Sequence, residues 1–137
     1  MIRWYETAPK HRFARSPLLR EGTVSAANHD AAWPALATND AGTLFIGYAR
    51  GGSSECLGIW AATVPAGSGT AAQTALIAAG GARYEFGPGL DRWGDVSVAN
   101  RDPVTPADVA IFGAFAEDQG SSTTFAFRAH VALLADV

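Results

Sequence analysis

Apolar and polar residues alternate along most of the chain in short runs, and this period of two is typical of half-buried β-strands. The runs are rich in Val, Ile, Phe, Tyr and Trp, and clusters of Gly, Pro, Asn and Asp separate them as turns do. Helical periodicity is scarce. The pattern predicts strands over residues 2–6, 18–25, 32–38, 43–50, 57–64, 74–79, 94–99, 109–117 and 123–134.

One segment has a competing interpretation. The Ala-rich stretch Ala71 to Ala79 favours a helix on intrinsic propensity alone. Glycines crowd both of its ends, at positions 67, 69, 80 and 81, and glycine weakens helices. We therefore expect a strand within this stretch.

The chain also contains an internal repeat, which is the signature of a repetitive architecture. The matched pairs of stretches begin at Trp33 and Trp93, at Phe45 and Phe112, and at Ile59 and Phe127. The members of the first pair are 60 residues apart and those of the third pair 68, so the spacing drifts only by loop insertions. One unit then holds three or four antiparallel strands, as a blade of a β-propeller does.

The predicted fold is therefore all-β, in the form of a partial β-propeller with about two four-stranded antiparallel blades. Residues 32–79 form one blade and residues 94–134 supply the next. Residues 1–25 would be the outer strands of a preceding blade. The whole chain, residues 1–137, is expected to form a single partial propeller.

The composition argues against several classes of function. The net charge of −3 argues against binding to nucleic acid or to an anionic membrane surface, because both need a basic face. One cysteine, Cys56, allows no disulfide within the chain, and three scattered histidines do not suggest a metal site. We expect no cofactor and no metal. Residues 1–20 lack the apolar core of a secretory signal, so any export signal is expected upstream of Met1.

Three stretches carry a resemblance to a known family. They are Ile2-Arg3-Trp4-Tyr5-Glu6, the segment from Trp33 to Gly42, and Arg92-Trp93-Gly94-Asp95 followed by Asn100-Arg101-Asp102-Pro103. Together they resemble the last blades of bacterial sialidase-like propellers that contain Asp boxes, and the match runs through nearly the whole chain. The resemblance implies an extracellular parent protein that is associated with glycans. It says little about activity, because such propellers occur as glycosidases and as noncatalytic modules.

The sharpest motif is Thr38-Asn39-Asp40-Ala41-Gly42-Thr43-Leu44-Phe45, which is similar to an Asp box. The motif predicts a hairpin in which Asp40 accepts backbone N–H groups, Gly42 adopts a positive φ and Phe45 returns to the core. Thr38 opens the motif. The family resemblance implies a structural turn away from any active site.

The residues Arg92, Trp93 and Asp95 are candidates for ligand binding. Gly94 would allow a close backbone approach, and Asp95 would point a carboxylate toward the central channel, where propellers bind ligands. The alternative is that Trp93 packs between blades as a core residue. Both interpretations stay open at the level of sequence.

Catalysis by this chain alone is not expected. Sialidases, which the chain resembles, use a tyrosine nucleophile that is assisted by a glutamate, and Tyr5-Glu6 contains both residue types. Adjacent residues of a strand point to opposite faces, so these two side chains cannot easily work together. We predict no catalytic residues in this chain.

Two functional hypotheses remain. In the first, the chain is a fragment of a secreted sialidase-like propeller, is associated with glycans and is completed by the remaining blades of a parent chain. In the second, the chain is a complete noncatalytic lectin-like or protein-interaction module that closes a propeller by homo-oligomerisation. Stacking faces for sugar rings would come from Trp4, Trp33, Tyr48, Trp60 and Trp93. Two blades alone would also leave apolar positions such as Phe112, Ala114 and Ala116 partly in water.

Overall fold

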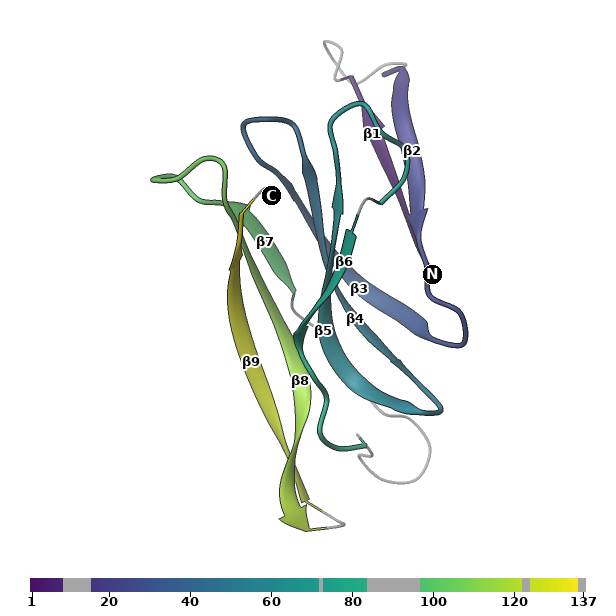
Figure 1. Ribbon diagram of the computed structural model, residues 1–137, viewed down its shortest axis with the longest axis vertical. Helices are drawn as coiled ribbons and strands as arrows, with labels where there is room; N and C mark the ends of the chain where they lie inside the picture. The colour runs from purple at the N-terminus through teal and green to yellow at the C-terminus, as the bar shows by residue number, and fades with distance from the viewer. Residues whose placement is uncertain (9–15, 72, 84–96, 122–123, 136–137) are drawn as a thin grey trace.

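The computed structural model describes residues 1–8, 16–71, 73–83, 97–121 and 124–135. Within these ranges the chain forms β-strands and no helix, so the all-β prediction is confirmed (Figure 1). The strands are β1 (Ile2–Thr7), β2 (Leu18–Val24), β3 (Asp30–Thr38), β4 (Leu44–Gly52), β5 (Glu55–Val64), β6 (Gln73–Ala78), β7 (Val98–Arg101), β8 (Val109–Ser121) and β9 (Thr124–Leu134).

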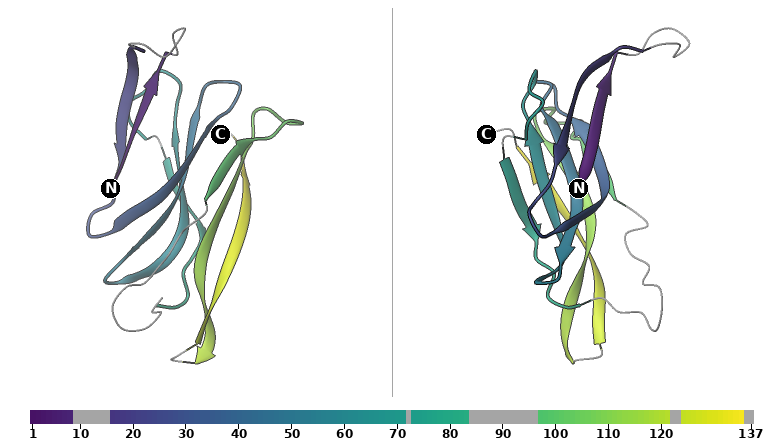
Figure 2. Two further views of the ribbon diagram at one scale, coloured as in Figure 1. Left: turned by 180° about the vertical axis from the view of Figure 1, so that it is seen from behind. Right: turned by 90° about the vertical axis from the view of Figure 1, so that its right-hand side faces the viewer.

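The strands form three antiparallel sheets, and each sheet follows chain order. The first sheet contains β1 and β2, the second sheet runs β3-β4-β5-β6, and the third sheet runs β7-β8-β9. The second and third sheets are meanders, in which each strand pairs with its neighbour in the chain, and the first sheet is an antiparallel pair of strands. The second sheet lies between the other two, with the first sheet on one face and the third sheet on the other (Figures 1 and 2).

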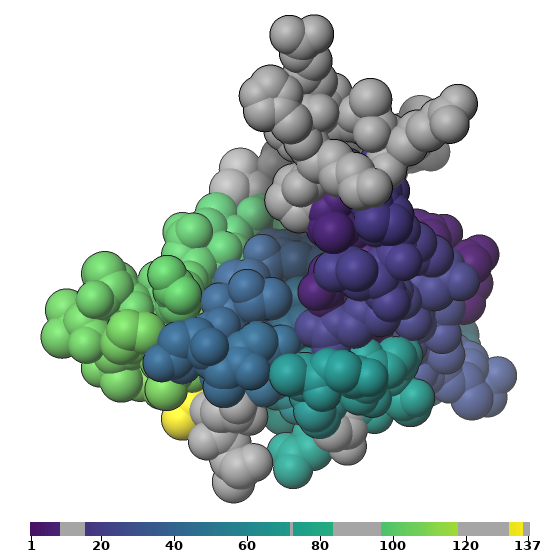
Figure 3. All heavy atoms as spheres, turned by 90° about the horizontal axis from the view of Figure 1, so that it is seen from above, coloured from purple at the N-terminus to yellow at the C-terminus, as the bar shows by residue number. Residues whose placement is uncertain are grey.

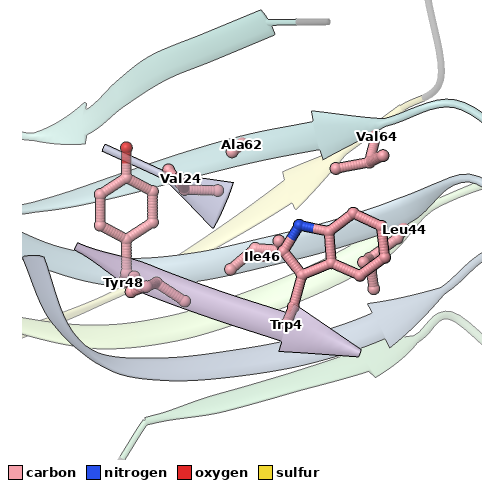
Figure 4. Packing of buried hydrophobic residues seen from close by; sticks show 8 residues of the cluster. Trp4, Val24, Leu44, Ile46, Tyr48, Ala62 and Val64 are labelled. Atoms are coloured by element: carbon pink, nitrogen blue, oxygen red, sulfur yellow. The ribbon is translucent and has the colours of Figure 1, made fainter. Parts of the chain in front are cut away.

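The core between the first and second sheets is built around Trp4. Its indole is 2% exposed and packs over Leu44, Ile46 and Val64, as Figure 4 shows. Tyr48 extends the same cluster along β4. Since these side chains come from β4 and β5, the strands β1 and β2 lie over the two middle strands of the second sheet.

The core between the second and third sheets depends on close backbone approach. Phe45 and Ala61 face Val109 and Ile111 across this interface. Gly47 and Gly113 have no side chain, and this leaves room for the isoleucines that lie opposite them. A Cβ at Gly47 would overlap Ile111, and a Cβ at Gly113 would stand 3.2 Å from Ile59.

The Ala-rich stretch and the apolar positions of β8 test two expectations about local structure. Residues 73–78 of the Ala-rich stretch form strand β6, so the helical alternative is wrong. The expectation that Phe112, Ala114 and Ala116 stay partly in water is confirmed for Phe112, which is partly exposed. It is wrong for Ala114 and Ala116, which are 7% and 0% exposed and pack with Leu57 and Ala82. The chain after β6 covers this part of β8, where Gly81 N donates to Ala116 O at 2.8 Å.

Candidate functional site

The turn between β3 and β4 is closed by Asn39. Its side chain is buried, and its Oδ1 accepts a hydrogen bond from Thr43 N at 2.9 Å. Asn39 N donates to Thr43 O at 3.1 Å, and Gly42 has a φ of +80°. The acceptor expected at Asp40 therefore lies one residue earlier in the chain, and the Asp40 side chain is exposed.

The same turn links the second sheet to the third. Asn39 Nδ2 donates to Ala107 O at 3.1 Å, and Asp40 N donates to Pro106 O at 3.1 Å. Thr38 is exposed at the end of β3, and Phe45 is fully buried below the turn. The polar groups of Asn39 and the backbone N–H of Asp40 therefore serve contacts that hold the turn and join the two sheets.

A second polar cluster surrounds Arg20 of β2. The guanidinium pairs with Glu6 and donates to three carbonyl oxygens: Pro65 at 2.7 Å, Ser68 at 3.2 Å and Gly42 at 3.2 Å. Its Cζ also lies 5.7 Å from the Trp4 ring centroid, within cation–π range. Figure 3 shows the β3–β4 and β5–β6 turns beside the first sheet at this end of the molecule. Arg20 therefore joins the first sheet to both turns.

A third cluster centres on Glu55, which opens β5. Its carboxylate lies 2.7 Å from His29 Nε2 and accepts from Arg50 Nη2 at 2.9 Å and from Trp60 Nε1 at 3.1 Å. The Arg50 Cζ stands 3.3 Å above the Trp60 ring. Three side chains of the same chain, from His29, Arg50 and Trp60, thus hold this carboxylate.

Tyr48 lies near this cluster, and its phenol can be considered as a nucleophile because tyrosine serves as one in some enzymes. It is 4% exposed, and burial raises the pKa of its phenol, with the Glu55 charge also raising it and the Arg50 charge lowering it. A nucleophile needs the opposite, an accessible group that loses its proton readily. The cluster is a structural clamp on the β4–β5 hairpin.

The structure also places the other candidates from the sequence. Tyr5 is exposed on the outer face of β1, whereas Glu6 is directed to the inner face and pairs with Arg20. These two residues therefore do not form a working pair. Arg92, Trp93 and Asp95 lie outside the described residues.

A groove of about 270 Å³ runs between β1 and β3. Its floor and walls are largely apolar, with Leu36 of β3 43% exposed in it. The lining residues are Trp4, Tyr5, Glu6, Leu36, Ala37, Thr38 and Leu44. It exists because the first sheet has only two strands, which leave β3 uncovered beside the edge of β1.

Trp33 of β3 combines an unusual backbone conformation with an exposed side chain. Its φ is +50°, which is rare for a bulky residue, and the residue before a proline is normally extended. A β-bulge occurs here, because Ala32 faces Ala49 while Ala35 faces Gly47. Such strain costs about 1–3 kcal/mol and persists only where the surroundings impose it. Ser97 Oγ holds the site by donating to Trp33 O at 2.8 Å.

Trp33 is also accessible. It is 39% exposed, whereas Trp4 and Tyr48 are buried and Trp60 lies beneath Arg50. Among the stacking candidates within the described residues, Trp33 therefore offers the most accessible ring. From the sequence, Trp33 is one of five aromatic residues that could stack on a sugar ring. The Trp-Pro pair within a predicted strand is the signal in the sequence for a bulge.

Other classes of site are not found in the described part of the chain. No group of three or more His, Cys, Asp or Glu residues there could hold a metal ion. The same residues include no helix long and apolar enough to cross a membrane. Comparison of the chain with protein-family models, with curated proteins and with solved structures finds no match.

Proposed function

We propose that this chain supplies consecutive blades of a sialidase-like β-propeller and acts as a noncatalytic, carbohydrate-binding part of it. The observation that carries the proposal is the stacking of three antiparallel sheets in chain order. Propeller blades are antiparallel meanders that repeat around an axis, and each blade packs its faces against its neighbours.

The second and third sheets support this proposal as equivalent units. Their first strands, β3 and β7, lie against one another, and β8 packs against both β4 and β5. The hydrogen bonds from Asn39 and Asp40 join the β3–β4 turn to the β7–β8 turn, so equivalent turns lie at the same end. A repeat unit related to the next by a rotation would give this arrangement.

The noncatalytic part of the proposal rests on the carboxylates. Glu6 is paired with Arg20, and Glu55 is held by His29, Arg50 and Trp60. A general acid or base must be within reach of a substrate proton. Using either group would require breaking contacts that hold the sheets or a hairpin together.

The groove between β1 and β3 indicates where a propeller would continue. A further strand on the free edge of β1 would cover Leu36 and Thr38 and extend the first sheet toward a full blade. Other blades of a parent polypeptide are the source we favour. The same free edge favours a second candidate, in which copies of this chain complete the ring.

The test is a glycan array probed with the purified protein, together with an assay for released sugar. We expect binding to carbohydrate and no release of product. Binding to no glycan would contradict the carbohydrate function and leave a structural or protein-interaction domain. Sedimentation velocity separates the two candidates for completing the ring, because closure by copies requires an oligomer.

A further inference from the structure

We infer that Trp33 is a platform on which an uncharged sugar ring stacks. The inference rests on the proposed carbohydrate function and adds to it a contact residue and a ligand class. It starts from the strained backbone at position 33, since strain of this kind concentrates at functional sites.

The strain gives the fold no evident benefit. Trp33 as a whole residue is 39% exposed and belongs to none of the hydrophobic clusters of the described residues. A glycine at this position would adopt a positive φ without penalty. Packing in these clusters therefore does not account for a bulky aromatic residue at this position, and bulges of this type re-aim a side chain near a functional site.

The chemistry of the ring favours a sugar. An indole combines a broad apolar face with an N–H donor, so it suits a ligand that has one apolar face and polar groups around it. A pyranose ring presents C–H groups on its face and hydroxyl groups at its rim. The face would stack on the indole, and a hydroxyl would accept from Nε1.

The charges around the site favour an uncharged ligand. Strand β3 carries one charge, at Asp30, and the segment from Ser97 to Asn100 carries none. On the neighbouring strand β4, Arg50 lies opposite Ala31 and is already paired with Glu55. An acidic sugar needs a cationic partner such as arginine. We therefore expect hexoses and N-acetylhexosamines to bind more tightly than N-acetylneuraminic acid.

The experiment titrates the ¹⁵N-labelled protein with galactose, mannose, N-acetylglucosamine and N-acetylneuraminic acid and follows the indole N–H signals. The Trp33 signal is assigned from the variant Trp33→Phe. We expect it to shift with at least one uncharged sugar, while the signals of Trp4 and Trp60 stay in place. The absence of any Trp33 shift with sugars that bind would overturn the inference on the folded wild-type protein.

Two variants separate binding from folding. Trp33→Gly should lose at least tenfold in affinity and keep or raise the unfolding midpoint, because glycine relieves the strain. A purely structural tryptophan would instead show a lower midpoint. The matched control is Leu76→Ala, an exposed apolar residue of β6 in the same sheet, for which we expect less than a twofold change in affinity.

The outcomes also distinguish this inference from the proposed function. Glycan binding that Trp33→Gly leaves intact overturns the role of Trp33 and retains the carbohydrate function. Binding through Trp33 that favours N-acetylneuraminic acid overturns the ligand class. Binding of no glycan by the wild-type protein overturns both proposals.

Discussion

Gly47 of β4 faces Ile111 of β8, and the absence of a side chain at position 47 is what lets the isoleucine enter the second sheet. A Cβ at position 47 would overlap Ile111 Cγ2 and would lie 3.2 Å from Ile111 Cδ1. Because Ile111 is 1% exposed, it has no free space into which it can move. This contact fixes the spacing of the second and third sheets.

Replacing Gly47 with valine should therefore destabilise the protein by about 1–3 kcal/mol, the usual cost of overpacking a core. Urea denaturation measures this change. The control is Thr74→Val on the exposed strand β6, where we expect a change within about 0.5 kcal/mol. Adding Ile111→Ala to Gly47→Ala should give a loss smaller than the sum of the single losses, and strict additivity would argue against the contact.

The turn motif predicts a difference between two neighbouring residues. Asn39→Ala should cost about 1–3 kcal/mol, because it leaves Thr43 N and Ala107 O without their buried partner. Asp40→Ala should change stability by no more than about 0.5 kcal/mol, because the side chain is exposed. Thermal denaturation of both variants checks this order. A larger loss of stability for Asp40→Ala than for Asn39→Ala would instead indicate that the Asp40 side chain holds the turn.

Arginines 20 and 3 give a second matched pair. Arg20→Met should cost about 2 kcal/mol, because charge-assisted hydrogen bonds to Pro65, Ser68 and Gly42 are lost. Arg3→Met removes an exposed pair with Glu21 and an exposed cation–π contact with Tyr5, and exposed ion pairs contribute about 0–1 kcal/mol. Equal midpoints for the two variants in guanidinium chloride would show that Arg20 does not join the sheets.

Stability should fall in alkali because of Tyr48. Burial raises the pKa of this phenol above its ordinary value of 10.0, so the folded state keeps a proton that the unfolded state loses. The contribution is present in full below about pH 10 and is lost as pH rises toward and through the folded-state pKa. Urea midpoints measured from about pH 8 to about pH 11 should decline less for Tyr48→Phe than for the wild type. Parallel declines would contradict this assignment.

Much of the fold could be predicted because strand patterns are local. Alternation and turn residues placed β4 over residues 43–50 and β5 over residues 57–64, close to the observed Leu44–Gly52 and Glu55–Val64. Flanking glycines correctly outweighed the helix propensity of the Ala-rich stretch, which forms β6. The positions of β1 and β2 were predicted as well.

The polar clusters could not be predicted because they join residues that are distant in sequence. Arg20 meets Pro65 and Ser68 only after three sheets have stacked. The burial of Ala114 and Ala116 depends in the same way on the chain that follows β6. In the turn, the motif identified the hairpin, but the choice between two adjacent polar residues depended on the neighbouring Ala107 carbonyl.

The stacking of sheets in chain order is the central claim, and nuclear Overhauser contacts test it most directly. We predict cross-peaks between the Hα protons of Gly47 and the methyl groups of Ile111, and between those of Gly113 and Ile59. The Hα contacts between Ala35 and Gly47 within the second sheet serve as the internal control. Absence of both inter-sheet cross-peaks, with the control present, would contradict the stacked arrangement.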